Sequence, residues 1–385
     1  MKKLLIALML ILCSNIVWAA PDASPELPLN LLEESSVNNV NNFIQAVNKE
    51  LNEDIPLLTA ETIKDIATKG LSFNWQSLGN KFISYLFKEL ATNIHLMGKL
   101  LFLAVLCALL QNLQNSFEQS AISLLAYSVC FIFLCVIALS AFYQGLSLAR
   151  ETVGNMVGFM EALLPLLLSL LAGVGALTSA ALFTPLMLLV VSVTSVIVKD
   201  IILPLLFLTA VLECVNYLSG KYKLSNLTGV LKQAGMIILG LVLVVFIGIV
   251  SIQGVAGSVA DGLTLRTAKY ATATFIPVVG KMFADTVELV MGASLLLKNA
   301  VGIFGVLTIA LLCALPLVKL ISLVVVIKIA GALIQPMGDE KMAKCLDAMG
   351  NNLLLVFGAL LTVALMFFLV VTMIIGAGSV AMMLR

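Results

Sequence analysis

The stretch from Gly262 to Gly305, GLTLRTAKYATATFIPVVGKMFADTVELVMGASLLLKNAVGIFG, decides how the chain is organised. It is neither uniformly apolar nor composed like a soluble loop, although very apolar segments flank it on both sides. Its charged side chains are Arg266, Lys269, Lys281, Asp285, Glu288 and Lys298. Because a simple membrane anchor does not carry so many charges, the stretch predicts a polar hairpin within a membrane protein.

The helical spacing of this stretch predicts one charged face. Lys281, Asp285 and Glu288 stand at i, i+4 and i+7, so the cation and both carboxylates project from the same side of a helix. Pro277 and Gly280 interrupt that helix, and we expect the pieces to be too short to cross a bilayer individually. Two structures remain open: an amphipathic segment on the membrane surface, or a re-entrant, cavity-lining hairpin over residues 258–300.

Composition places the chain among polytopic, all-α integral membrane proteins. Of 385 residues, 61% are hydrophobic and 11% are charged, and the mean hydropathy is +1.12. A net charge of +1 provides no basic field for nucleic acid. From Ile94 onwards, windows of about twenty apolar residues predict about nine spans, near 95–114, 120–145, 157–178, 180–198, 201–219, 235–256, 301–319, 320–337 and 353–380.

The amino-terminal part divides into two segments before the membrane domain, which we place at 93–385. Residues 1–19 have a basic start, an apolar centre and small residues at the end, as in a signal peptide. Residues 20–92 form an exported, acidic region in which three short helices are predicted, over 40–51, from Thr59 towards Lys69, and from Trp75 or Leu78 into Leu90. Because these helices bury little surface, we expect them to pack on the membrane domain or on a partner. A partly disordered tail is the alternative.

Cation placement predicts the orientation in the membrane. Lys221, Lys223 and Lys232 form a cationic cluster that we assign to a short loop, which the positive-inside rule places in the cytoplasm. Counting spans from an exported amino terminus then leaves Arg385 in the cytoplasm and the central stretch at the outer face.

Two further charges lie within apolar runs. Glu161 stands one helical turn before Pro165, and it marks either a polar pathway or a helix mouth reached by water. Lys328 is predicted to be the most deeply embedded charge, whereas Glu213 and the Lys199–Asp200 pair are interpreted as charges at helix ends.

The chain lacks the motifs of several chemistries. Its seven cysteines include no CxxC pair, so neither a disulfide framework nor a metal site is predicted. HExxH, GxSxG and GxxxxGK[ST] are also missing from the sequence. We therefore predict no catalytic residue and no cofactor, and we do not expect an enzyme.

Two blocks carry a resemblance to a known family. EALLPLLLSLLAGVGALTSAALFTP at 161–185 and the block at 262–302, together with the signal peptide and the acidic exported region, resemble the stage III sporulation protein AE family of endospore-forming bacteria. The resemblance implies a multi-pass component of the mother-cell membrane facing the forespore, with an extracytoplasmic amino-terminal region. It also implies a channel or secretion-like complex with other stage III A proteins and forespore protein Q, which sustains forespore gene expression. The family supplies no established catalytic residue.

A secondary transporter of a small solute is the alternative function. Transporters of this kind carry broken helices with charges near the membrane midplane, often in two matching halves. We find no matching halves in this sequence, so the channel component is the preferred hypothesis. Membrane lipid is an expected partner, nucleic acid is not, and a homo-oligomer remains open.

Overall fold

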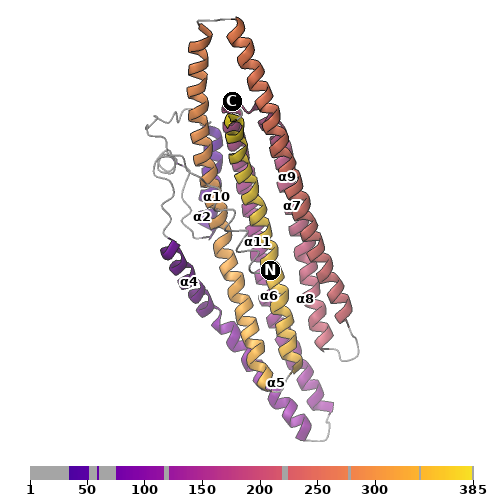
Figure 1. Ribbon diagram of the computed structural model, residues 1–385. Coiled ribbons are helices and arrows are strands. Elements are labelled where there is room, and N and C mark those ends of the chain that lie inside the picture. Colours follow the sequence, from indigo (N-terminus) through magenta and orange to yellow (C-terminus); the bar gives the residue numbers. More distant parts are fainter. Residues whose placement is uncertain are drawn as a thin grey trace.

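A computed structural model describes residues 34–51, 59, 75–116, 121–218, 224–275, 279–337 and 340–383. Every secondary-structure element within these ranges is helical (Figure 1), which confirms the all-α class. The signal peptide, the helix predicted after Thr59, and Lys221 and Lys223 lie outside the described residues.

Several helices of the bundle, α6, α9, α10 and α11, are longer than the predicted spans. The elements of the bundle are α6 (Ala121–Gly173), α7 (Leu177–Val196), the π-helix η2 (Ile197–Ile202), α8 (Leu203–Leu218), α9 (Ser225–Phe275), α10 (Val279–Ile334), the 3-10 helix η3 (Gln335–Met337) and α11 (Glu340–Met383). In the described chain, five helices are long and apolar enough to cross a membrane, or six if one bent pair counts as a span. The chain is therefore a multi-pass membrane protein, and in the described residues several of the nine predicted spans lie within single longer helices.

Predicted spans merge where the expected boundaries lie inside helices. The boundaries at 145–157 and 319–320 are internal to α6 and α10. The Lys199–Asp200 pair lies in η2, just before Pro204, where π-helical geometry makes room for a residue without a backbone N–H. Asp200 pairs with Arg150 in the middle of α6 at 2.9 Å. Asp200 thus has a partner in another helix, and both Lys199 and Asp200 lie within a continuous helical run and not at a helix end.

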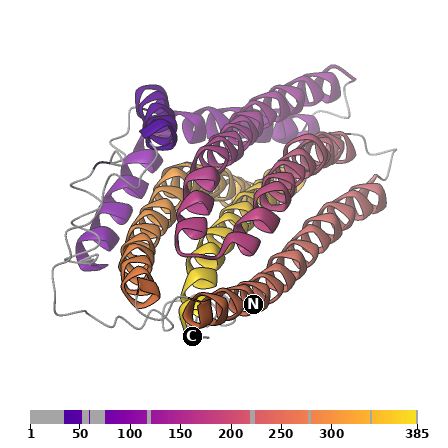
Figure 2. The same ribbon diagram turned by 90° about the horizontal axis from the view of Figure 1, so that it is seen from above.

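Helix α11 is the central element of the bundle. It packs along α10 and also contacts α6, α8 and α9, whereas α9 and α10 contact each other only slightly. Figures 1 and 2 show α9 and α10 on either side of α11. The α9–α10 hairpin therefore straddles the carboxy-terminal helix.

The central stretch consists of long helical arms. Helices α9 and α10 have 51 and 56 residues and are continuous with the flanking apolar segments, so the expectation of short pieces is wrong. Helix α9 ends before residues 276–278, which include Pro277, and α10 begins after them. Gly280 lies in the first turn of α10. The ends of both arms extend beyond the rest of the bundle (Figure 1). Whether the hairpin is re-entrant or lies on the membrane surface stays a prediction.

The described amino-terminal helices pack on the bundle, as their small apolar area predicts. On α2 (Glu34–Leu51), Val40 and Ile44 are buried, and the Phe43 ring lies 6.2 Å from that of Phe159 on α6. Helix α4 (Trp75–Thr92) contacts α10, and α5 (Ile94–Ser116) contacts α6 and α10. The segments on either side of Asn93 are bent by 45°.

The end of α11 lies at the same end of the bundle as the tips of the α9–α10 hairpin. Figure 1 shows the end of α8 and the start of α9 at one end of the bundle, and the end of α9, the start of α10 and the end of α11 at the other. The predicted spans 301–319 and 320–337 form one helix, which removes one crossing from the count. If the α8–α9 connection is cytoplasmic, the end of α11 is therefore on the outer side with the hairpin.

An acidic side chain on α9 caps the start of α7. Asp261 is 1% exposed and accepts hydrogen bonds from the backbone N–H groups of Thr178 at 2.9 Å and Ser179 at 3.2 Å. The residue at the N-cap position, Ala176, provides no side-chain cap, and Gly175 makes the preceding turn with a φ of 89°. Asp261 thus supplies from another helix the cap that α7 lacks.

We expect Asp261→Ala to lower the free energy of unfolding by about 1 to 2 kcal/mol, because buried N–H groups lose their acceptor. Asp261→Asn should lose less, since its amide oxygen still accepts a hydrogen bond. Thermal unfolding in detergent measures both changes. Unfolding of both variants at the parent's temperature would show that the cap contributes nothing.

Candidate functional site

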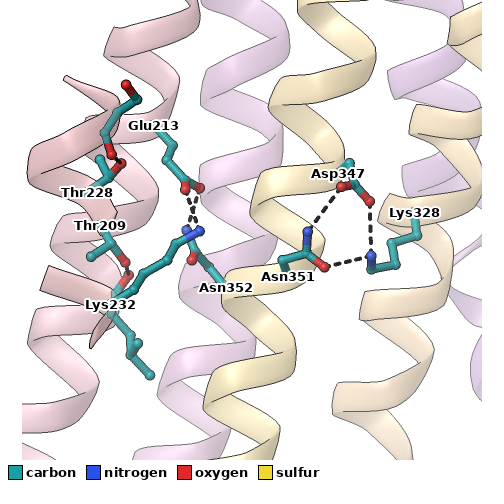
Figure 3. Close-up of polar contacts among 10 residues, drawn as sticks. Thr209, Glu213, Thr228, Lys232, Lys328, Asp347, Asn351 and Asn352 are labelled. Atoms are coloured by element: carbon teal, nitrogen blue, oxygen red, sulfur yellow. Dashed lines mark hydrogen bonds and ion pairs between the residues drawn. The ribbon is translucent and has the colours of Figure 1, made fainter. Parts of the chain in front are cut away.

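The first half of α11 carries two groups of paired polar side chains (Figure 3). The α8–α9 cluster consists of Glu213 on α8, Lys232 on α9 and Asn352 on α11. The α10 cluster consists of Lys328 on α10 and Asp347 and Asn351 on α11. The two clusters lie on different sides of α11, so this helix has direct polar contacts with α8 and α10 and is linked to α9 through Glu213.

In the α8–α9 cluster, one carboxylate joins three helices. Glu213 Oε1 lies 2.5 Å from Lys232 Nζ, and Glu213 Oε2 accepts a hydrogen bond of 2.7 Å from Asn352 Nδ2. The Glu213 side chain is 9% exposed, and that of Lys232 is 23% exposed. Since both carboxylate oxygens have a partner, this charge is compensated where water is scarce.

The α10 cluster forms a closed ring of three side chains. Lys328 Nζ donates to Asp347 Oδ1 at 2.9 Å and to Asn351 Oδ1 at 2.8 Å, and Asn351 Nδ2 donates to Asp347 Oδ2 at 3.0 Å. A Cβ atom at Gly350 would stand 2.7 Å from Lys328 Cγ. The glycine therefore lets the lysine stem lie against α11.

The α10 cluster is the more exposed of the two, so its loss should cost less. The side chains of Lys328 and Asp347 are 36% and 61% exposed. We expect Lys328→Met to lower the free energy of unfolding by at most about 1 kcal/mol, as for other solvated pairs. Chemical denaturation in detergent tests this, and a loss several times larger would mean that the ring is not solvated.

The structure places the other predicted site residues separately. Lys298 is fully buried and donates to the Ile375 carbonyl oxygen on α11 at 2.8 Å. Lys298, and not Lys328, is therefore the more deeply embedded lysine. Glu161 has an exposed side chain with a long contact of 3.5 Å to the Ser192 hydroxyl. The side chains of Arg266, Lys269, Lys281, Asp285 and Glu288 lie outside the described residues.

Sequence reasoning missed most of both clusters. Glu213 was expected at a helix end, and Lys232 was assigned to a loop, but Lys232 lies within α9 and pairs with Glu213. The adjacent amides Asn351 and Asn352, directly before an apolar run, were a usable signal, because polar groups at such depth need partners. Their partners come from other helices, which no local pattern identifies.

The arrangement suits mechanical and electrostatic roles. Carboxylates, ammonium groups and amides in both clusters are bound to one another, so they hold helices in register and keep charge at defined positions. Such pairs do not present a nucleophile or an acid to a substrate.

Long apolar helices, three of them joined through the largely buried Glu213–Lys232 pair and Asn352, define this chain as a polytopic α-helical membrane protein. Its residues 58–378 match the family of stage III sporulation protein AE. Over 314 residues, which are 82% of this chain and 79% of the relative, it is 41% identical to stage III sporulation protein AE of Bacillus subtilis (strain 168). The chain belongs to the stage III sporulation protein AE family, which confirms the resemblance. No solved structure matches it.

Proposed function

We propose that the chain is a membrane component of the complex that links the mother cell to the engulfed forespore and is needed for endospore formation and forespore gene expression. The observation that carries the proposal is the 41% identity to the sporulation protein over 82% of the chain. The matched region, 58–378, includes the α9–α10 hairpin and most of α11. In this proposal the chain resides in the mother-cell membrane facing the forespore, with its amino-terminal region outside the cytoplasm.

Within such a complex, the chain would act by assembly. The α8–α9 and α10 clusters keep the bundle in one arrangement, and the arms of the α9–α10 hairpin extend beyond it (Figure 1). Helical spacing puts Lys281, Asp285 and Glu288 on one face of α10, which requires water or a partner. We assign this face to contact with the other stage III A proteins and, through them, with forespore protein Q.

Complementation tests the proposal. A Bacillus subtilis strain that lacks its own stage III sporulation protein AE should recover heat-resistant spores and late forespore reporter expression when this chain is expressed in the mother cell. A tagged copy should also co-purify the other stage III A proteins. A chain that accumulates in the membrane but restores neither spores nor reporter would contradict the proposal.

A transport assay, combined with the complementation result, distinguishes the transporter alternative. Purified chain reconstituted alone in lipid vesicles should show no gradient-driven solute uptake if it works only within a complex. Uptake by the chain alone, without restored sporulation, would favour a secondary transporter.

A further inference from the structure

Three buried thiols from three helices meet beside the α8–α9 cluster. They belong to Cys135 on α6, Cys214 on α8 and Cys345 on α11, and their sulfur atoms all lie within 4.8 Å of one another. Cys345 Sγ is 3.9 Å from Cys214 Sγ, and the Met349 thioether sulfur is 3.7 Å from Cys214 Sγ. The three cysteines are at most 6% exposed. This thiol cluster is a concentration of soft donor atoms in an apolar interior.

The sulfur spacing fits a shared metal ion. With a metal–sulfur bond of about 2.3 Å, two sulfurs stand about 3.8 Å apart in tetrahedral geometry and about 4.0 Å apart in trigonal geometry. The distance of 3.9 Å between Cys214 and Cys345 falls between these values. A disulfide requires about 2.05 Å and would join only two of the three sulfurs.

The surrounding contacts hold the sulfurs in place. Cys345, Met349 and Asn352 stand at i, i+4 and i+7 on α11, so they share one face of that helix. Cys214 follows Glu213, whose carboxylate is held by Lys232 and Asn352. Helix α8 is thereby fixed against α11 next to the thiols, and both Glu213 oxygens are already engaged. The site therefore offers sulfur and no free carboxylate from this neighbour.

We propose that Cys135, Cys214 and Cys345 form a binding site for a soft monovalent cation, Cu(I), with the Met349 thioether as a fourth sulfur beside it. Thiolate and thioether ligands favour Cu(I). Zinc sites instead use four ligands drawn from Cys, His and carboxylates, and a thioether is not among them. Bound Cu(I) would join α6, α8 and α11. This site is independent of the proposed sporulation role.

The thiol cluster was not predictable from cysteine spacing. We expected no metal site because the chain has no CxxC pair, and the three cysteines are separated by 79 and 131 positions (214 − 135 and 345 − 214). Only the packing of α6, α8 and α11 brings them together.

Copper retention by the purified full-length chain tests the proposal. The reduced protein in detergent is loaded anaerobically with Cu(I) and then competed with the chelator bicinchoninate. It should retain one equivalent of copper, and X-ray absorption should show only sulfur ligands around the ion. Cys135→Ser, Cys214→Ser and Cys345→Ser should each weaken retention by about 100-fold or more, since second-shell changes alone cost about 10- to 100-fold. Cys313→Ser removes a buried thiol outside the cluster, on α10, and should retain copper like the parent.

A second measurement covers variants that fold poorly. Cu(I) should raise the unfolding temperature of the parent and of Cys313→Ser, because the ion binds only the native arrangement. The proposal would be overturned if the parent retains no Cu(I), or if Cys313→Ser loses as much copper binding as the cluster variants. It would also be overturned if the parent prefers Zn(II), or if the chain is isolated with a Cys214–Cys345 disulfide. If the cluster variants do not accumulate, the parent's sulfur shell and copper stoichiometry decide.

Discussion

Replacing Lys232 with methionine is expected to lower the free energy of unfolding by about 3 kcal/mol, because the buried Glu213 carboxylate loses its cation. This is the low end of the range for broken buried pairs. Lys232 keeps 23% of its side chain exposed, and Asn352 still donates to the carboxylate. Thermal unfolding in detergent, together with the protein level in the membrane, measures the loss.

A double variant separates ion pairing from the loss of packing. Lys232→Met combined with Glu213→Gln removes both charges, so it should recover a large part of the stability lost by Lys232→Met alone. Lys344→Met is the matched control, because Lys344 pairs with Glu340 at the bundle surface with both side chains well exposed. Additive losses in the double variant, or an equal loss in the control, would show that Glu213 does not depend on Lys232.

The second large effect is expected at Gly302, where α10 packs against α11. A Cβ atom at Gly302 would collide with the Ile375 side chain. Gly302→Leu should therefore destabilise the bundle by about 3 kcal/mol or more, at the upper end of overpacking effects. The expected result is a low yield of monodisperse protein and a reduced unfolding temperature.

Controls on the same helix test the steric origin of this effect. Nothing lies within 4 Å of a Cβ atom at Gly292, also on α10. Gly292→Leu should thus be neutral, or slightly stabilising through its helix propensity. Shortening the opposing side chain by Ile375→Ala should recover part of the Gly302→Leu loss. If Gly302→Leu and Gly292→Leu change the stability equally, the effect at Gly302 arises from helix propensity and not from close packing against Ile375.

These two predictions concern the same property of the proposed complex subunit. The α8–α9 cluster and the Gly302 contact both hold α11 against its neighbours, one through charge and the other through shape. Sporulation assays on Lys232→Met and Gly302→Leu should therefore follow the amount of folded chain. A variant that accumulates normally but still blocks spore formation would identify a position used by a partner.

The sequence by itself determined the class of protein and its family. Hydropathy predicted a multi-pass all-α membrane protein, because backbone polar groups in lipid must be satisfied within each helix. The blocks at 161–185 and 262–302 led to the sporulation family, which the comparisons confirm. Both conclusions depend on local residue order, so they required no knowledge of which helices touch.

Tertiary structure alone decided the lengths of the helices and the contents of the interior. A hydropathy window treats a charge in an apolar run as a break, yet Asp200 is satisfied by Arg150, and Lys232 by Glu213, across helix contacts. Paired charges can stay inside helices: Asp200 lies in the unbroken helical run from α7 to α8, and Lys232 lies within α9, which remains separate from α8. The thiol cluster has the same origin, since three cysteines without a common motif become neighbours only when α6, α8 and α11 pack together.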